Sequence, residues 1–237
     1  MLEELKREVL AANKKLVSEH LIILTWGNVS GYDPETDLVV IKASGIEYDE
    51  MGLEHMVVCN MEGQVVESEC NPSTDLATHI SLYRSFPAIR GIVHTHSTYA
   101  TTWAQTGEDI PCYGTTHADY FPGSVPCTRK MTDGEVRGDY EKNTGAVIAE
   151  RFRDLDPEVM RAVLVRCHGP FVWGSDPMDA LHNACVLEAV AETAYRTRQM
   201  LGEKQSLVDA VLLKKHYDRK FGEDAYYGQD YGKEVSA

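Results

Sequence analysis

The feature that most constrains the fold is the alternation of short apolar, β-branched runs with segments of helical periodicity. Several of the apolar runs are joined by tight turns, such as Glu62-Gly63, which predicts hairpins within one sheet. We therefore expect one α/β domain, a mixed sheet with helices on both faces. The predicted strands are one within ILTWGNVSGYDP, which ends in a turn, and 38–41, 56–59, 64–66, 91–94, 162–167 and 171–174. The predicted helices are 3–21, one that begins at a cap at Ser73 or Thr74 and ends by Pro87, 97–105, 135–153, a long one from Asp176 or Asp179 to 194, and 206–221.

Charge and cysteine usage exclude several classes of function. The 237-residue chain has a formal net charge of −14, which argues against a nucleic-acid partner and against docking on anionic membranes. A small phosphorylated substrate needs only a few local donors and stays compatible with this charge. The six cysteines are scattered without a CxxC pair, and neither a signal peptide nor an apolar run long enough to span a membrane is evident. We expect a cytoplasmic protein with reduced thiols, mostly buried.

Two histidines at the end of an apolar run point to a metal site. In GIVHTHSTYA, His94 and His96 stand two apart, so that both project from the same face of a strand. His168 follows the apolar strand AVLVRC and precedes Gly169-Pro170, where a loop can release it toward a ligand. Three neutral imidazoles suit zinc and leave an open coordination position for chemistry. Manganese or cobalt would also fit such a donor set when a carboxylate joins it.

Each of these residues also has a structural interpretation. His94 and His96 would be solvated if their strand lay on a sheet surface, although Ile92 and Val93 favour burial. Asp75 stands where a helix begins, and a carboxylate there commonly caps exposed amides. The residues alone leave Asp75 open between helix capping and metal ligation. The other histidines considered are predicted to be structural or solvent-facing, namely His20, His55, His79 and His182.

Longer stretches resemble the L-ribulose-5-phosphate 4-epimerase family of the class II aldolase/adducin superfamily. The resemblance rests on GIVHTHSTYATTWAQ, GTTHADYFPGSVPCTRKMTDGE, HGPFVWG and HYDRKFGEDAYYGQ, and on MLEELKREVLAAN, TWGNVS and IKASG near the N-terminus. It extends to about Gln229, and TTHADYF and AYYGQ favour the epimerase branch. It implies a single domain over 1–237 with a C-terminal tail at about 222–237. The implied fold is a three-layer α/β/α arrangement around a mostly antiparallel sheet, in a homotetramer with sites at subunit interfaces.

The resemblance implies metal-dependent epimerisation of L-ribulose 5-phosphate to D-xylulose 5-phosphate. C4 carries no acidic proton, so the implied route breaks the C3–C4 bond, lets glycolaldehyde phosphate present its other face, and re-forms the bond. Zinc would act as the Lewis acid. The resemblance places metal ligands at His94, His96 and His168, with Asp75 as a ligand or close neighbour of the metal.

The resemblance also assigns two acid–base groups, one for each face of the aldehyde. These are Asp119 and Tyr227, which would take and return the C4 hydroxyl proton from opposite sides. From the residues alone, Asp119 is better explained as a turn residue and Tyr227 as an aromatic anchor of the tail. Tyr227 is expected to serve the site of a neighbouring subunit.

Several short elements resemble the phosphate-binding segments of the family. Glycine lets a backbone amide approach an anion closely, and a helix N-terminus attracts one. Turns are rich in the same residue types, so each dipeptide alone is a weak signal. The implied substrate-binding residues are Gly27, Asn28, Ser44, Gly45, Ser73 and Thr74, with Lys42, Thr116, His216 and Arg219 as secondary contacts.

Three other functions compete with epimerisation. A class II sugar-phosphate aldolase would share the histidines but has no need of two groups on opposite faces of the aldehyde. An adducin-like scaffold would not require a complete ligand set, and a zinc hydrolase would not explain the phosphate-type segments. The sequence does not choose between arabinose and ascorbate breakdown, and the chain continues past Gln229 as DYGKEVSA, which departs from the family pattern.

Overall fold

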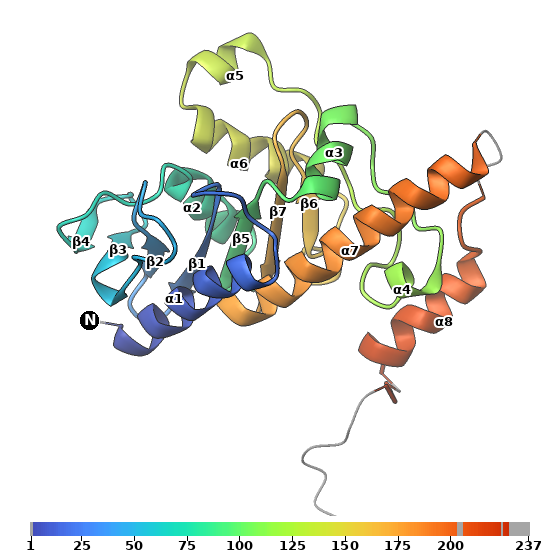
Figure 1. Ribbon diagram of the computed structural model, residues 1–237, viewed down its shortest axis with the longest axis horizontal. Coiled ribbons are helices and arrows are strands. Elements are labelled where there is room, and N and C mark those ends of the chain that lie inside the picture. Colours follow the sequence, from blue (N-terminus) through green and yellow to red (C-terminus); the bar gives the residue numbers. More distant parts are fainter. Residues whose placement is uncertain (1, 203–205, 224, 228–237) are drawn as a thin grey trace, which may run out of the picture.

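A seven-stranded antiparallel sheet forms the centre of the molecule (Figure 1). The computed structural model describes residues 2–202, 206–223 and 225–227. The strands lie in the order β4-β3-β2-β1-β5-β7-β6, and every neighbouring pair is antiparallel. In chain order the elements are α1 (Glu3–Ser18), β1 (Gly27–Asp33), β2 (Leu38–Lys42), η1 (Leu53–His55), β3 (Met56–Asn60), β4 (Val65–Glu67), α2 (Leu76–Ser85), β5 (Gly91–Thr95), α3 (Thr98–Thr106), α4 (Thr115–Ala118), α5 (Asp133–Arg137), α6 (Tyr140–Arg151), β6 (Ala162–Leu164), β7 (Pro170–Gly174), α7 (Pro177–Leu201) and α8 (Ala210–Phe221).

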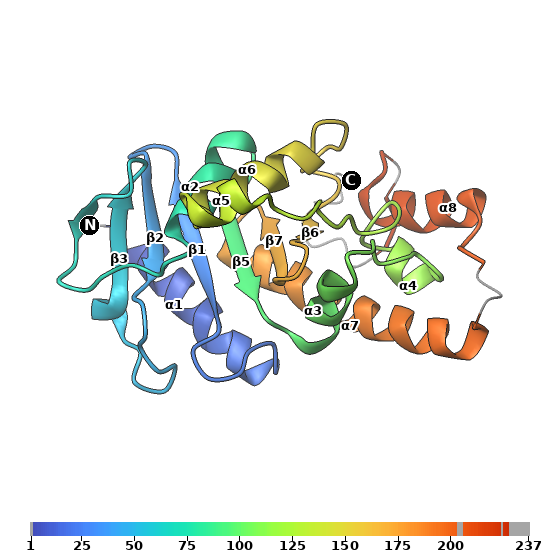
Figure 2. The ribbon, with the colours of Figure 1, turned by 90° about the horizontal axis from the view of Figure 1, so that it is seen from above.

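Helices cover both faces of the sheet (Figure 2). On one face α1 packs against β1 and β2, and α7 packs against β5 and β7. On the other face α2 and α6 pack against each other, and aromatic residues of both contact the sheet. The three-layer single domain confirms the predicted fold class, including the mostly antiparallel sheet that the resemblance implies. The mixed sheet expected from the residues alone is wrong, because every neighbouring pair of named strands is antiparallel. None of the helices within the described residues is long and apolar enough to cross a membrane.

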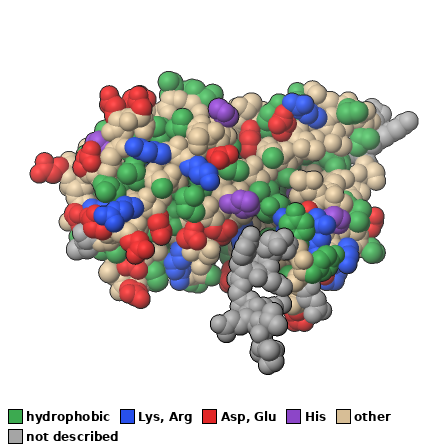
Figure 3. Space-filling model, turned by 60° about the horizontal axis from the view of Figure 1, so that its bottom comes forward, with side chains coloured by type: hydrophobic (Ala, Val, Ile, Leu, Met, Phe, Trp, Pro, Cys, Tyr) green, Lys and Arg blue, Asp and Glu red, His purple; other side chains and the backbone are tan. Residues whose placement is uncertain are grey.

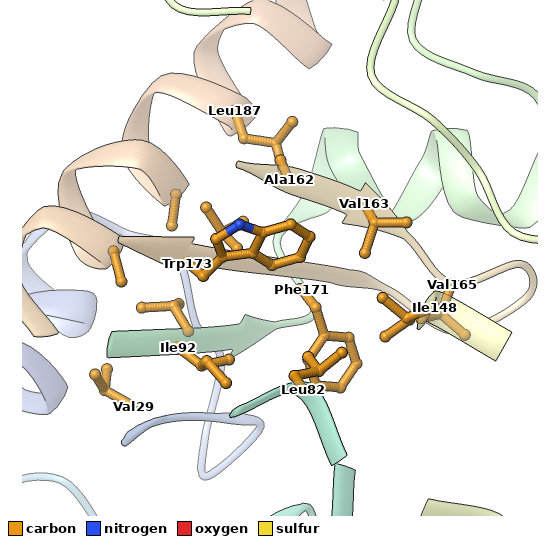
Figure 4. Close-up of a cluster of buried hydrophobic side chains, with 14 of the residues drawn as sticks. Val29, Leu82, Ile92, Ile148, Ala162, Val163, Val165, Phe171, Trp173 and Leu187 are labelled. Atoms are coloured by element: carbon orange, nitrogen blue, oxygen red, sulfur yellow. The ribbon is translucent and has the colours of Figure 1, made fainter. Parts of the chain in front are cut away.

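Two aromatic residues of β7, Phe171 and Trp173, lie in the core on the α2–α6 face among aliphatic side chains (Figure 4). The Trp173 ring on β7 lies 5.1 Å, centre to centre, from both Phe86 and Phe152, and its indole N–H donates to the carbonyl of Pro157 at 2.7 Å. Phe171, two residues earlier on the same strand, is fully buried on this face. The packing fixes β7 beside β5, which carries the first histidine of the predicted metal site.

On the opposite face of the sheet, a row of three glycines allows α7 to approach the strands closely. Gly31, Gly91 and Gly174 are paired across β1, β5 and β7. A side chain at Gly91 would lie 2.2 Å from the backbone oxygen of Asp176, which caps α7 by accepting the amide of Asp179 at 2.8 Å. The glycines therefore let the start of α7 rest directly on the sheet.

Three local predictions need correction. The predicted helix 135–153 is two helices, α5 and α6, because the chain turns at Gly138. The predicted strand 162–167 ends at Leu164, since 165–169 forms a turn in which the amide of Val165 donates to the carbonyl of Gly169. The N-cap of α2 is Asp75, neither Ser73 nor Thr74.

The remaining predicted helices and strands are present, but some ends differ: α8 begins at Ala210 and α7 runs on to Leu201. The cysteines are less buried than predicted. All six cysteines are free, and three of them are buried. Residues 224 and 228–237 of the predicted tail, with Gln229 among them, lie outside the described residues.

Candidate functional site

Three histidines meet at one end of the sheet. His94 is on β5, His96 follows one residue after that strand, and His168 lies in the turn between β6 and β7. One ring nitrogen from each lies within 4.8 Å of the others. The Nε2 atoms of His94 and His96 are 3.2 Å apart. Two imidazoles on one tetrahedral zinc ion would hold their nitrogens about 3.3 Å apart, so the spacing fits such an ion.

His94 is held in a metal-binding orientation by the backbone. Its Nδ1–H donates to the carbonyl of Pro170 at 2.9 Å, so that Nε2 carries the free lone pair. Its ring stacks on Phe171 at 4.2 Å with an interplanar angle of 14°. Strand pairing and the aromatic core thus fix this imidazole on both sides.

His96 is positioned by the helix that follows it. The Glu188 carboxylate on α7 accepts the backbone amides of Tyr99 at 2.8 Å and Ala100 at 2.9 Å. These amides belong to the first turn of α3, where no intrahelical acceptor is available. Glu188 therefore anchors the start of α3, two residues after His96.

Burial keeps the three imidazoles neutral. It lowers the pKa of His94 and of His96, and it lowers the pKa of His168 to about 4, with neighbouring imidazoles adding to the shift at His96 and His168. Neutral imidazole is the form that binds a metal. The site is thus ready to bind a divalent cation at neutral pH.

Asp75 faces the same pocket and does not cap its helix. It occupies the N-cap position of α2, but its side chain accepts no hydrogen bond from the helix amides. Its Oδ2 instead accepts the Asn28 side-chain amide at 2.6 Å. Burial opposes ionisation of this carboxyl, but attraction to His94 and His79 in their protonated forms and the hydrogen bond from Asn28 outweigh burial and lower the pKa of Asp75. Direct metal ligation by Asp75 stays a prediction, because the group of nitrogens within 4.8 Å of one another consists of the histidines alone.

The histidines open into a pocket of about 530 Å³, called the metal pocket below. Two loops, 42–45 and 71–75, form one wall. They are joined by hydrogen bonds from the Ser44 amide to the carbonyl of Asn71 and from the Ser73 amide to the carbonyl of Lys42. The six main predicted substrate-binding residues line this pocket together with the histidines and Asp75, namely Gly27, Asn28, Ser44, Gly45, Ser73 and Thr74. Of the predicted secondary contacts Lys42 lines it, whereas Thr116, His216 and Arg219 do not.

Lys42 adds a buried cation to the metal pocket. The residue is 2% exposed, and its ammonium lies 5.0 Å from the centre of the Tyr48 ring. Burial lowers the pKa of Lys42, while Asp75 and Glu47 oppose the shift. An anionic ligand would relieve the cost of burying this charge.

Asp119 and Tyr227 lie in a second group, called the Asp119 cluster below, together with His216 and Arg219. The Asp119 carboxylate, at the end of α4, accepts two hydrogen bonds from Arg219, at 2.8 and 2.6 Å, and one from His216 at 2.9 Å. The Arg219 guanidinium lies 4.8 Å from the centre of the Tyr227 ring, and Tyr227 is 58% exposed. Burial opposes ionisation of Asp119, but the hydrogen bonds from Arg219 and His216 outweigh burial and lower the pKa of the carboxyl.

The Asp119 cluster is part of a basic surface on an acidic protein. Helix α8 carries Lys214, Lys215, Arg219 and Lys220 within seven residues. In Figure 3, Asp and Glu side chains are more numerous toward the end opposite α8, whereas Lys and Arg side chains lie toward both ends. The cluster thus presents one paired carboxylate and an exposed phenol within a cationic surface.

The structure brings together part of the predicted site. The predicted metal and phosphate residues share the metal pocket, and Asp119 and Tyr227 share the Asp119 cluster. Neither Asp119 nor Tyr227 lines the metal pocket of the same chain. Sequence reasoning missed Trp26, Tyr140 and Glu141, which line the pocket, because no spacing pattern connects them to the histidines.

Comparison with known proteins identifies the family of this chain. Residues 7–195 match the model of the class II aldolase and adducin N-terminal domain. A solved L-fuculose 1-phosphate aldolase is 29% identical, with 92% of this chain and 96% of that chain covered and a TM-score of 0.75. YgbL of Klebsiella pneumoniae, described as a candidate aldolase, epimerase or decarboxylase, is 25% identical over 91% of this chain and 99% of its own, with a TM-score of 0.69. An L-fuculose-1-phosphate aldolase from Thermus thermophilus shares the fold at 24% identity, 85% and 99% coverage and a TM-score of 0.67. This chain therefore belongs to the class II aldolase and adducin family.

Proposed function

We propose that the protein is a metal-dependent sugar-phosphate epimerase that converts L-ribulose 5-phosphate to D-xylulose 5-phosphate. The observation that carries the proposal is the presence of two separate constellations. One is a three-histidine pocket with a carboxylate and phosphate-type loops, and the other is a carboxylate beside a tyrosine. Breaking and re-forming a carbon–carbon bond needs the first, and addition to either face of an aldehyde needs two acid–base groups as well.

The metal centre is assigned to His94, His96 and His168, with Asp75 as an additional ligand or close neighbour. A divalent ion bound there, zinc by preference and manganese or cobalt as substitutes, would supply Lewis acidity at the ketone and hydroxyl oxygens of the substrate. The Asn28 amide holds the Asp75 carboxylate toward the pocket.

The substrate phosphate is assigned to the other wall of the metal pocket. Lys42 supplies positive charge there, and Ser44, Ser73 and Thr74 supply hydroxyl donors. At Gly45 φ is +71°, and an added Cβ would meet no atom within 4 Å. Glycine thus meets the backbone requirement and leaves open space above the loop for an anion.

The proton steps are assigned to Asp119 and Tyr227. The lowered pKa of Asp119 keeps its carboxylate ionised at neutral pH, as a base for the C4 hydroxyl proton requires. Tyr227 would exchange the same proton from the opposite face after the aldehyde has turned. His216 and Arg219 hold the Asp119 carboxylate in place.

The two constellations would meet across a subunit interface. Because Asp119 and Tyr227 do not line the metal pocket of their own chain, we assign them to the pocket of a neighbour in a homotetramer. The exposed Tyr227 ring is available for such a contact. We further predict a role in pentose catabolism, such as arabinose breakdown, and a cytoplasmic location.

Aldol cleavage with release of products is the second candidate. It is favoured by the 29% identity to an L-fuculose 1-phosphate aldolase over 92% of this chain. Incubation of the purified protein with L-ribulose 5-phosphate separates the two functions. Epimerisation predicts D-xylulose 5-phosphate, lost on chelation and restored by zinc. Accumulation of dihydroxyacetone and glycolaldehyde phosphate without epimer would instead establish cleavage.

A further inference from the structure

Tyr140 contacts the third histidine of the metal centre directly. Its hydroxyl lies 3.2 Å from Nδ1 of His168, and the two rings are within 27° of parallel with centres 6.2 Å apart. Tyr140 is the first residue of α6 and lines the metal pocket. The contact joins a helix on one side of the pocket to the turn between β6 and β7.

The contact occupies one ring nitrogen of His168 and leaves the other open toward the pocket. Imidazole binds a metal through the nitrogen that carries no proton, and the partner of the other nitrogen decides which one that is. At His94 the Pro170 carbonyl accepts from Nδ1–H and frees Nε2. At His168 the phenol oxygen of Tyr140 occupies the equivalent place beside Nδ1, which leaves Nε2 for the metal.

The backbone around His168 offers less support than the strand beneath His94. His168 lies in a five-residue turn next to Cys167, whose φ of +65° is left-handed. His94, by contrast, is paired with Asn28 and Phe171 on the neighbouring strands. The orientation of the His168 ring therefore depends on a side-chain contact.

Contacts with α2 hold helix α6 in place, and with it Tyr140. The Thr78 hydroxyl on α2 donates to the carbonyl of Glu141 at 2.6 Å. Farther along α6, an added Cβ at Gly145 would lie 2.4 Å from Cβ of Ser81, so the two helices pack in near-direct backbone contact. Since α2 also carries Asp75 at its start, one helix pair places both Asp75 and Tyr140 at the pocket.

We propose that Tyr140 is a positioning residue that holds His168 with its proton on Nδ1 and its Nε2 directed at the metal. The inference rests on the metal centre of the proposed function and is independent of the substrate. Loss of a hydrogen bond to a ligating histidine typically costs 10- to 100-fold in metal affinity. Tyr140→Phe should therefore raise the zinc dissociation constant by roughly tenfold or more while leaving the fold intact.

The test compares Tyr140→Phe with Tyr195→Phe. The Tyr195 hydroxyl also forms a hydrogen bond, to Gln199 on the surface of α7, so it controls for loss of a phenol elsewhere. Zinc affinity is measured by competition with a chelator, and the His168 tautomer is read in the metal-free protein from ¹⁵N-histidine NMR. We expect weaker zinc binding and loss of the Nδ1–H signature of His168 in Tyr140→Phe alone. Unchanged affinity with an unchanged tautomer would overturn the proposal.

A double-mutant cycle separates positioning from a general effect on the fold. In a His168→Asn background there is no imidazole to orient, so adding Tyr140→Phe should change zinc affinity little further. Fully additive losses would mean that Tyr140 acts on the site without His168, which contradicts the proposal. The thermal midpoint of each metal-free variant is recorded alongside. None of these readouts uses a sugar substrate, so failure of the epimerase assignment would leave the result interpretable.

Discussion

The metal pocket rests on buried strands, whereas the Asp119 cluster joins a four-residue helix to α8, about a hundred residues later in the chain. In the pocket, burial and strand pairing hold neutral imidazoles in place. In the cluster, charge pairing holds an ionised carboxylate against an arginine. The pocket thus brings three neutral imidazoles together, while the cluster presents a paired carboxylate and an exposed phenol at the surface. The difference teaches that the histidine pocket and the paired carboxylate are held by different forces on separate parts of this fold.

The largest expected effect comes from removing a histidine of the metal pocket. His96→Asn should weaken zinc binding by roughly 10²- to 10³-fold, because one of a small number of ligands is lost, and should abolish turnover. Metal content by mass spectrometry and the epimerase assay check this outcome. His20→Asn is the matched control, since His20 is exposed in the turn after α1 and should be silent. Full zinc content in His96→Asn would remove that residue from the metal centre.

Removing the carboxylate of the Asp119 cluster should separate chemistry from metal binding. Asp119→Asn should lower kcat by roughly 10³-fold, within the range typical of lost acid–base catalysis, with zinc content unchanged. Asp109→Asn controls for loss of a surface carboxylate that also pairs with an arginine, here Arg151. Loss of zinc in Asp119→Asn would show that the carboxylate supports the fold of the metal pocket instead.

The tyrosine of the same cluster should show a smaller effect. Tyr227→Phe keeps the ring that stacks on Arg219 and removes only the hydroxyl, so we expect kcat to fall by roughly 10²-fold with the same elution volume as the wild type. Tyr226→Phe, the adjacent residue whose ring lies under Lys215, is the control. Steady-state kinetics and size-exclusion chromatography give the two readouts. Unaltered turnover in Tyr227→Phe would take this residue out of the mechanism.

The smallest effect concerns stability and pH. Burial lowers the pKa of His117, two residues before Asp119, to about 4, so the folded state keeps His117 neutral while the unfolded state takes up a proton below about 6.5. Stability should therefore fall as pH drops from about 6.5 toward 4, with His117 contributing about 2 kcal/mol between pH 7 and pH 5. The pKa of Asp119 is also lowered, but the stabilisation from its ion pairs is lost only when the pH falls below the ordinary pKa of an aspartate carboxyl group.

Urea unfolding of the metal-free protein at pH 7 and pH 5 measures this difference. His117→Gln keeps an amide donor in place of the ring N–H that reaches the carbonyl of Gly123 at 2.8 Å, yet it does not titrate. The variant should lose less stability than the wild type between the two pH values. Equal losses would show that His117 is not the group responsible.

Local spacing made the metal pocket predictable from the sequence. Two histidines at i and i+2 on a strand, and a third after an apolar run, are visible in the residues themselves, and the structure brings all three together. The order of strands in the sheet was not visible, because it depends on pairing between distant segments. The close packing of α7 against the sheet was not visible either, because it requires Gly31, Gly91 and Gly174 to be in register on three strands.

Contacts that depend on tertiary packing could not be predicted from the sequence. Tyr140 and Glu188 support metal-site histidines from helices that follow no motif, and the break at Gly138 that starts α6 at Tyr140 was not predicted. Asp119 and Tyr227 came from family resemblance alone. The structure shows them joined through Arg219, and their proposed meeting with the metal pocket of a second chain stays a prediction.

Complementation between two inactive variants tests most directly whether the metal pocket and the Asp119 cluster of different subunits form one site. His96→Asn and Asp119→Asn are co-expressed with different tags, and the mixed oligomers are purified and assayed. In a cyclic oligomer with random mixing, a site has an intact pocket and an intact neighbouring cluster in about a quarter of cases, so about a quarter of wild-type activity should return. Mixed oligomers as inactive as their parents would contradict the account.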